Sequence, residues 1–275
     1  MPDLFEDSLK RIKRAKVHAD AFWNEVIRIF PKEGYSVSLD KENERTWIVT
    51  AIFKTPPNDE LLSLELGEFF YQLRAALDAL IWKAVWIKDG REPSADANRL
   101  EFPICPNQEK FDTAAIHKFN FPQELRNWIS TIQPYSAEKT VDDPERGLNS
   151  TLKTLHDCAR KDRHRRLHVA AAVASTVQLD FLDGFPEGVS FRSAEILPAD
   201  FLKGRNKFLR LELASETGTL PSFQRHLATA LKIDISVDEF ANWTDEGFPG
   251  EIVRLGGAVE HVRRRFEEYF AQASS

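Results

Sequence analysis

The segment Arg160–His168, with the sequence RKDRHRRLH, holds the side chains best suited to chemistry in this chain. A histidine whose pKa is near 6.5 can take up and release a proton close to neutral pH. An arginine stays charged and can hold phosphate oxygens through paired N–H groups. Both properties suit phosphodiester cleavage in RNA, where a proton leaves the 2′-hydroxyl and charge builds on the phosphate.

The spacing of these two residues resembles a known signature. Arg163 is followed by a polar residue, His164, then by three residues and by His168. This pattern resembles that of the HEPN superfamily, whose members are small helical bundles, frequently dimers, with the Arg and His in a cleft between helices. The resemblance implies a metal-independent endoribonuclease of antiphage defence or of a toxin–antitoxin pair. It implies that Arg163 is the phosphate clamp and that His168 is the catalytic acid and base. It also implies RNA and a second copy of the chain as partners.

A second resemblance covers residues 65–168. The segments LGEFFYQLRAALDALIWKAV, EFPIC, IQPY and DRHRRLH occur in the order seen in a family of uncharacterised bacterial proteins. Tyr71, Gln72 and Ala79 depart from that family's pattern, which has His, Asn and His at these positions. The resemblance implies that one constellation contains the supporting residues Arg74, Asp78, Asp162, His164 and Arg165.

A purely structural network is the main alternative. On an unbroken helix Arg163 and His168 would lie 140° apart and would not share a face. Asp162 and Arg166 are spaced to pair with each other, and Arg163 could pair with Asp78 of the most apolar helix. In this interpretation the histidines are only solvated.

Other sites have weaker signals. His164 and His168 are spaced as a metal pair on a helix, but no third ligand stands out, so we expect neither a metal nor another cofactor. Arg254 and His261 also fall within the looser HEPN spacing, but two intervening glycines lead us to treat that pair as chance. We expect the six tryptophans to be mostly core residues rather than platforms for bases.

Composition narrows the class of protein. The 275 residues carry a formal net charge of −6, so any nucleic-acid site must be a local basic patch. Cys105 and Cys158 are the only cysteines and lack metal-ligand spacing. No segment is long and apolar enough to span a membrane, and we expect a cytoplasmic protein.

Hydrophobic periodicity predicts an α+β fold. About four long helices should form a bundle, with an N-terminal β-hairpin and a small antiparallel sheet. We expect a single domain, 1–275, with a helical core at 1–30, 58–90, 109–175 and 250–272 and β elements at 34–55 and 176–236. The segment PSFQRHLATAL, within the second β region, is ambiguous and could be helical. Asn149 or Ser150 should cap the helix that carries the motif.

The sequence thus leaves two functions open. One is a HEPN-like endoribonuclease that uses Arg163 and His168. The other is a non-enzymatic binding protein whose Arg/Asp/His network is structural. The sequence does not decide whether the chain is an enzyme. It also leaves open the oligomeric state and the partner of the β region.

Overall fold

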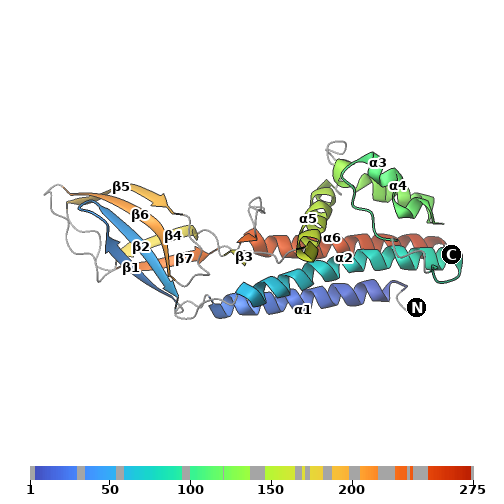
Figure 1. The fold of residues 1–275 in the computed structure, drawn as a ribbon, viewed down its shortest axis with the longest axis horizontal. Coiled ribbons are helices and arrows are strands. Elements are labelled where there is room, and N and C mark those ends of the chain that lie inside the picture. The colour runs from blue at the N-terminus through green and yellow to red at the C-terminus, as the bar shows by residue number, and fades with distance from the viewer. Residues whose placement is uncertain are drawn as a thin grey trace. The chain divides into compact units, whose positions relative to one another are not determined.

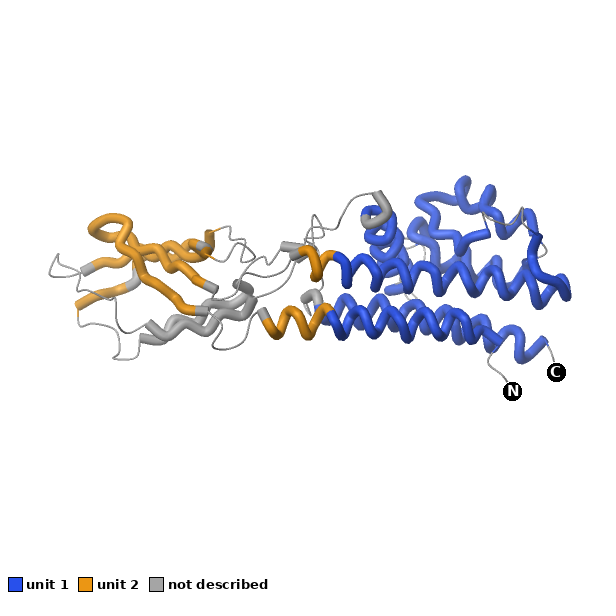
Figure 2. Tube along the Cα trace, turned by 60° about the horizontal axis from the view of Figure 1, so that its bottom comes forward, with its two compact units in different colours: residues 1–21, 64–167, 249–275 blue, residues 22–63, 168–248 orange. Residues whose placement is uncertain are grey.

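The fold is α+β, as the sequence predicts. The computed structural model describes residues 4–29, 35–53, 59–94, 100–119, 121–136, 146–164, 169–170, 174–181, 188–197, 205–215, 227–233, 236–237 and 247–273. The chain divides into two compact units, coloured separately in Figure 2. Unit 1 comprises residues 1–21, 64–167 and 249–275, and unit 2 comprises residues 22–63 and 168–248. Whether these units behave as the predicted single domain stays a prediction.

Four long helices supply most of unit 1 (Figure 1). They are α1 (Glu6–Ile29), α2 (Asp59–Asp89), α5 (Arg146–His164) and α6 (Gly247–Ala273). The short helices α3 (Gln108–Asp112) and α4 (Gln123–Thr131) and the 3₁₀ turns η2 (Ala115–His117) and η3 (Pro134–Ser136) lie between α2 and α5 in sequence. The four predicted helical segments are therefore present.

Helix α2 is central because apolar residues cover most of its circumference. The apolar residues of α2 that are buried within unit 1 include Leu66, Phe70, Leu73, Leu77, Leu80, Ile81 and Ala84. Gly90 follows the helix with φ of 67°, a left-handed conformation that glycine adopts without a steric penalty, and so ends it as predicted.

The core of unit 1 also joins helices that are distant in sequence. The fully buried ring of Phe266 on α6 packs edge-on against Phe5, with ring centroids 5.8 Å apart. It also contacts Phe121 and Trp128 on the segment around α4. Burial of such rings is the main favourable contribution to folding in this unit.

Unit 2 contains antiparallel strands. A four-stranded sheet has the order β1 (Tyr35–Lys41), β2 (Thr46–Phe53), β6 (Arg205–Ser215) and β5 (Val189–Ile196). The N-terminal hairpin therefore shares one sheet with the later strands. Two further pairs are β4 (Ala174–Phe181) with β7 (Leu227–Ile233), and β3 (Val169–Ala170) with β8 (Ser236–Val237).

Two local predictions were wrong. The helix expected to reach residue 175 ends at His164, and Val169–Ala170 and Ala174–Phe181 are strands. A run of alanine and valine fits a buried strand as well as a helix, and here its backbone pairs with other strands. The segment PSFQRHLATAL, which the sequence left ambiguous, contributes its last residues to the strand Leu227–Ile233. Asn149 is not a cap, because α5 already begins at Arg146.

Within the described residues, no helix combines the length and the apolar character that crossing a membrane would require.

Candidate functional site

A pocket of about 660 Å³ lies in unit 1 along one face of α2, and we call it the α2 pocket. Its α2 residues recur every three or four positions, as expected for one face of a helix. Helix α1 adds acidic and basic side chains, and α5 adds Ala159. The full lining is Asp7, Lys10, Arg11, Tyr71, Arg74, Ala75, Asp78, Ala79, Trp82, Lys83, Trp86, Glu92, Leu100 and Ala159. Cationic and aromatic side chains thus meet in one concave surface.

The supporting residues Arg74 and Asp78 both line this pocket and form an ion pair. Nη1 of Arg74 lies 2.7 Å from Oδ1 of Asp78, one helical turn further along α2. The Arg74 side chain is only 7% exposed, so the pair compensates a charge that burial would otherwise strongly disfavour. Glu101 adds a second carboxylate 3.6 Å from Nη2.

The same pair binds the backbone of the EFPIC segment. Nη2 of Arg74 donates to the carbonyl of Phe102 at 2.7 Å, and the amide of Phe102 donates to Asp78 at 2.9 Å. Both polar groups of a fully buried residue are therefore satisfied by side chains of α2. The Arg74–Asp78 pair is thus a clamp that holds residues 101–102 against the helix.

Gln133, in the IQPY segment, secures the other end of EFPIC. Its side-chain amide donates to the carbonyl of Pro103 at 2.9 Å and accepts from the amide of Cys105 at 2.8 Å. Asn149 of α5 donates to the carbonyl of Gln133 at 2.7 Å. Three segments that the second resemblance groups by sequence order are thus joined by buried hydrogen bonds, which gives them a structural role.

The segment RKDRHRRLH begins near the C-terminal end of α5. Asp162, Arg163 and His164 form the last residues of that helix, and only their backbone is described. Arg165 and His168 lie outside the described residues. Arg163 comes one turn after Ala159, which lines the α2 pocket. Residues 165–168 lie outside the described residues, so the 140° separation calculated for an unbroken helix stays a prediction for Arg163 and His168.

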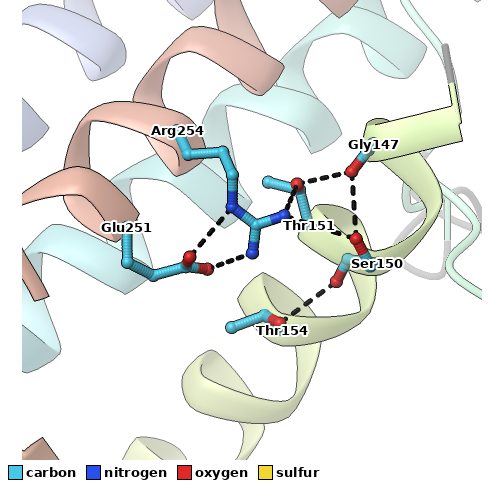
Figure 3. Close-up of polar contacts among 6 residues, drawn as sticks. All are labelled: Gly147, Ser150, Thr151, Thr154, Glu251 and Arg254. Atoms are coloured by element: carbon cyan, nitrogen blue, oxygen red, sulfur yellow. Dashed lines mark hydrogen bonds and ion pairs between the residues drawn. The ribbon is translucent and has the colours of Figure 1, made fainter. Parts of the chain in front are cut away.

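Arg254 and His261, which we set aside as chance, line a common pocket on α6. They are seven residues apart, so they lie on one helix face, and the start of α5 completes the pocket. The guanidinium of Arg254 is already engaged: it binds both carboxylate oxygens of the buried Glu251 and donates to Thr151 at 2.6 Å (Figure 3). This geometry links α6 to α5, and most of the guanidinium's donors are already used in these contacts.

The two cysteines lack the features of reactive thiols. Burial raises the pKa of Cys105, although the nearby Arg74 opposes this effect. Burial also strongly raises the pKa of Cys158, which is fully buried. Both thiols are therefore held in the protonated, weakly nucleophilic form at neutral pH. Among the side chains that the structure describes, no group of three or more His, Cys, Asp or Glu residues could hold a metal ion.

Comparison of the chain with protein-family models, curated proteins and solved structures finds no match in any of the three. The geometry of the site therefore carries the functional argument by itself.

The sequence predicted that Arg74 and Asp78 belong to one site, but it did not predict most of the other residues that line the α2 pocket. Trp86 is 38% exposed and Tyr71 is 50% exposed, and both line the α2 pocket, contrary to the expected core role of tryptophan. The spacing of Tyr71, Ala75, Ala79, Trp82 and Trp86 along one helix face was the available signal. The roles of Gln133 and the Phe102 backbone had no local signal, because they depend on contacts distant in sequence.

Proposed function

We propose that the protein is a metal-independent endoribonuclease that cleaves single-stranded RNA. Arg163 holds the scissile phosphate, and His168 takes the proton from the 2′-hydroxyl. The 2′ oxygen then bonds to phosphorus, the bond to the 5′ oxygen of the next nucleotide breaks, and that oxygen takes a proton from water. The supporting residues are His164, Arg165, Asp162, Arg74 and Asp78. A homodimer acting in antiphage defence or in a toxin–antitoxin pair is the setting that the HEPN resemblance suggests.

One observation carries the proposal. The α2 pocket combines cations and aromatic rings with Ala159, the residue one turn before Arg163 on α5. Cations neutralise phosphates and aromatic rings stack on unpaired bases, so this lining has the two chemical features that single-stranded RNA needs. The motif proposed to cleave RNA thus follows, along its own helix, a pocket suited to bind RNA.

The test is cleavage of a labelled 20-nucleotide single-stranded RNA in EDTA. We expect the wild type to cleave, and we expect Arg163→Ala and His168→Ala to lose at least 100-fold in rate while staying folded. Arg160→Ala, an exposed arginine on the same helix, is the matched control and should retain activity. Unchanged rates in both motif variants, with loss of activity in His261→Ala instead, would move the site to the α6 pocket.

A second function is supported by the hydrogen bonds of Arg74, Asp78 and Gln133. These residues hold the EFPIC segment in place, and this structural role explains their contacts without any catalytic activity. In that case the chain is a binding protein whose charged network is structural. Absence of RNA cleavage, together with a fall of several kcal/mol in the free energy of unfolding of Arg163→Ala, would favour this function.

A further inference from the structure

The α2 pocket has an aromatic side chain at each end and small residues between them. Tyr71 lies at one end, and Trp82 and Trp86 lie at the other. Ala75 and Ala79 form the surface between them. Tyr71 and Trp86 are fifteen residues apart, which corresponds to about 22 Å along a helix. This length exceeds that of a single base, so the pocket has the form of a groove for an extended ligand.

Each aromatic end also has a cation. Nζ of Lys83 lies 4.3 Å from the centroid of the Trp86 ring. Nη1 of Arg11 lies 3.4 Å from Oε1 of Gln72, the residue next to Tyr71. In the part of the chain that the structure describes, neither Lys83 nor Arg11 forms an ion pair with a carboxylate. Both charges are therefore available to an anionic ligand.

Arg74 adds a buried donor between the two ends. Its Nε–H is buried and has no hydrogen-bond acceptor among the described residues. A buried donor without an acceptor is unfavourable, and an oxygen of a bound ligand would satisfy it. The acidic lining residues are partly neutralised, since Asp78 pairs with Arg74 and Asp7 lies 4.0 Å from Lys10. Glu92 is the remaining carboxylate of the lining.

We propose that the α2 pocket binds a short segment of single-stranded RNA along the helix. One unpaired base stacks on Tyr71, and another stacks on Trp86 with Trp82 beside it. Arg11 and Lys83 hold the phosphates next to these two bases, and the backbone between them crosses Ala75 and Ala79 near Arg74. Paired bases cannot present their faces in this way, so the groove selects unpaired RNA. That RNA is the ligand rests on the proposed function, and the stacking geometry is the new element.

The experiment measures binding without cleavage. The probe is a fluorescein-labelled heptamer of 2′-O-methyladenosine, whose blocked 2′ oxygen cannot attack the phosphate, and its Kd is followed by fluorescence anisotropy. A second probe has the same 2′-O-methyl backbone with abasic residues throughout, so it keeps the charges and lacks the rings. We expect the abasic probe to bind at least 10-fold more weakly to the wild-type protein.

Variants separate stacking from charge. Tyr71→Ala and Trp86→Ala should each weaken binding of the adenosine probe about 5-fold or more, because each variant removes a ring on which a base stacks. Binding of the abasic probe should stay unchanged. Tyr71→Phe and Trp86→Phe should restore most of the affinity. Arg11→Gln and Lys83→Gln should weaken binding of both probes. Leu64→Ala and Lys88→Gln, exposed residues of α2 outside the lining, are the matched controls.

The outcomes distinguish this inference from the proposed function. Base-dependent binding that needs Tyr71 and Trp86, with no cleavage of ordinary RNA, would support RNA binding in the α2 pocket. The same result would contradict the proposed nuclease activity. Two results would contradict base stacking in the α2 pocket, even if RNA is cleaved. One is equal binding of the two probes, and the other is unchanged binding by Tyr71→Ala and Trp86→Ala variants that melt like the wild type.

Discussion

At the scale of single residues, the Arg74–Asp78 pair shows that one charged pair can both hold the backbone and line a pocket. It satisfies the amide and carbonyl of Phe102 and also lines the α2 pocket. The sequence could predict that Arg74 and Asp78 form an ion pair, because residues four positions apart on a helix are neighbours. It could not predict their backbone partner, which lies 24 to 28 residues further along the chain.

Removal of Arg74 should be strongly destabilising. We expect Arg74→Ala to lower the free energy of unfolding by about 3 kcal/mol, because it leaves Asp78 and the Phe102 carbonyl without their partner. Urea denaturation followed by circular dichroism measures this change. Lys88→Ala, an exposed cation of the same helix, should stay within about 0.5 kcal/mol of the wild type. A loss below 1 kcal/mol for Arg74→Ala would contradict the clamp.

Acid should weaken an ion-pair cluster on α6. Hydrogen bonds from Arg263 lower the pKa of Glu260 below its ordinary value, and the positive charges of Arg263 and Arg264 lower it further, although burial acts in the opposite direction. Because the folded pKa is lowered, the stabilisation by Glu260 is present above about pH 4.5 and is lost as pH falls through the folded pKa. Stability measured by urea denaturation from pH 7 to pH 3 should therefore fall less steeply in Glu260→Gln than in the wild type. Parallel curves for the two proteins would count against this assignment.

At the scale of elements, sequence periodicity predicted the regular segments well and their ends less well. Helices α1, α2 and α6 and the hairpin β1–β2 follow from residue spacing, glycine and proline. The end of α5 does not, because its motif runs into alanines and valines that fit either a helix or a strand. That boundary matters most for function, since it decides whether Arg163 and His168 share one helix.

Two glycines offer a test at this scale, Gly256 inside α6 and Gly90 directly after α2. A Cβ added to Gly256 would meet no atom within 4 Å, and glycine inside a helix is unfavourable. We expect Gly256→Ala to raise the free energy of unfolding by about 0.5–1 kcal/mol. Gly90→Ala is the opposite control, because the φ of 67° at this position strains any residue with a side chain. Thermal denaturation of both variants should therefore show shifts of opposite sign, and a destabilised Gly256→Ala would contradict this view of α6.

At the scale of the whole molecule, composition and pattern predicted an α+β protein with a helical core but not its division into two compact units. Each unit draws on segments that are distant in sequence. Periodicity reports only which residues are buried, so it cannot show which distant segments pack together. The residue ranges of α1, α2 and α6 each extend across a boundary between the units, so these helices are continuous through both.

This continuity predicts one cooperative unfolding transition. A helix that melts in one unit loses the support of its remaining turns in the other, which couples the two units. Urea curves from far-ultraviolet circular dichroism and from tryptophan fluorescence should therefore coincide, since Trp47 lies in unit 2 and Trp82, Trp86 and Trp128 lie in unit 1. Two separated transitions would show that the units unfold independently and would contradict the predicted single domain.

The most direct measurement of the central claim is incubation of the wild-type protein with end-labelled single-stranded RNA in EDTA, followed by analysis of the product ends. We predict fragments that end in a 2′,3′-cyclic phosphate and no cleavage of the 2′-O-methyl form of the same strand, because attack by the 2′ oxygen needs its free hydroxyl. Intact RNA after prolonged incubation with folded protein, or cleavage of both strands alike, would contradict a metal-independent endoribonuclease.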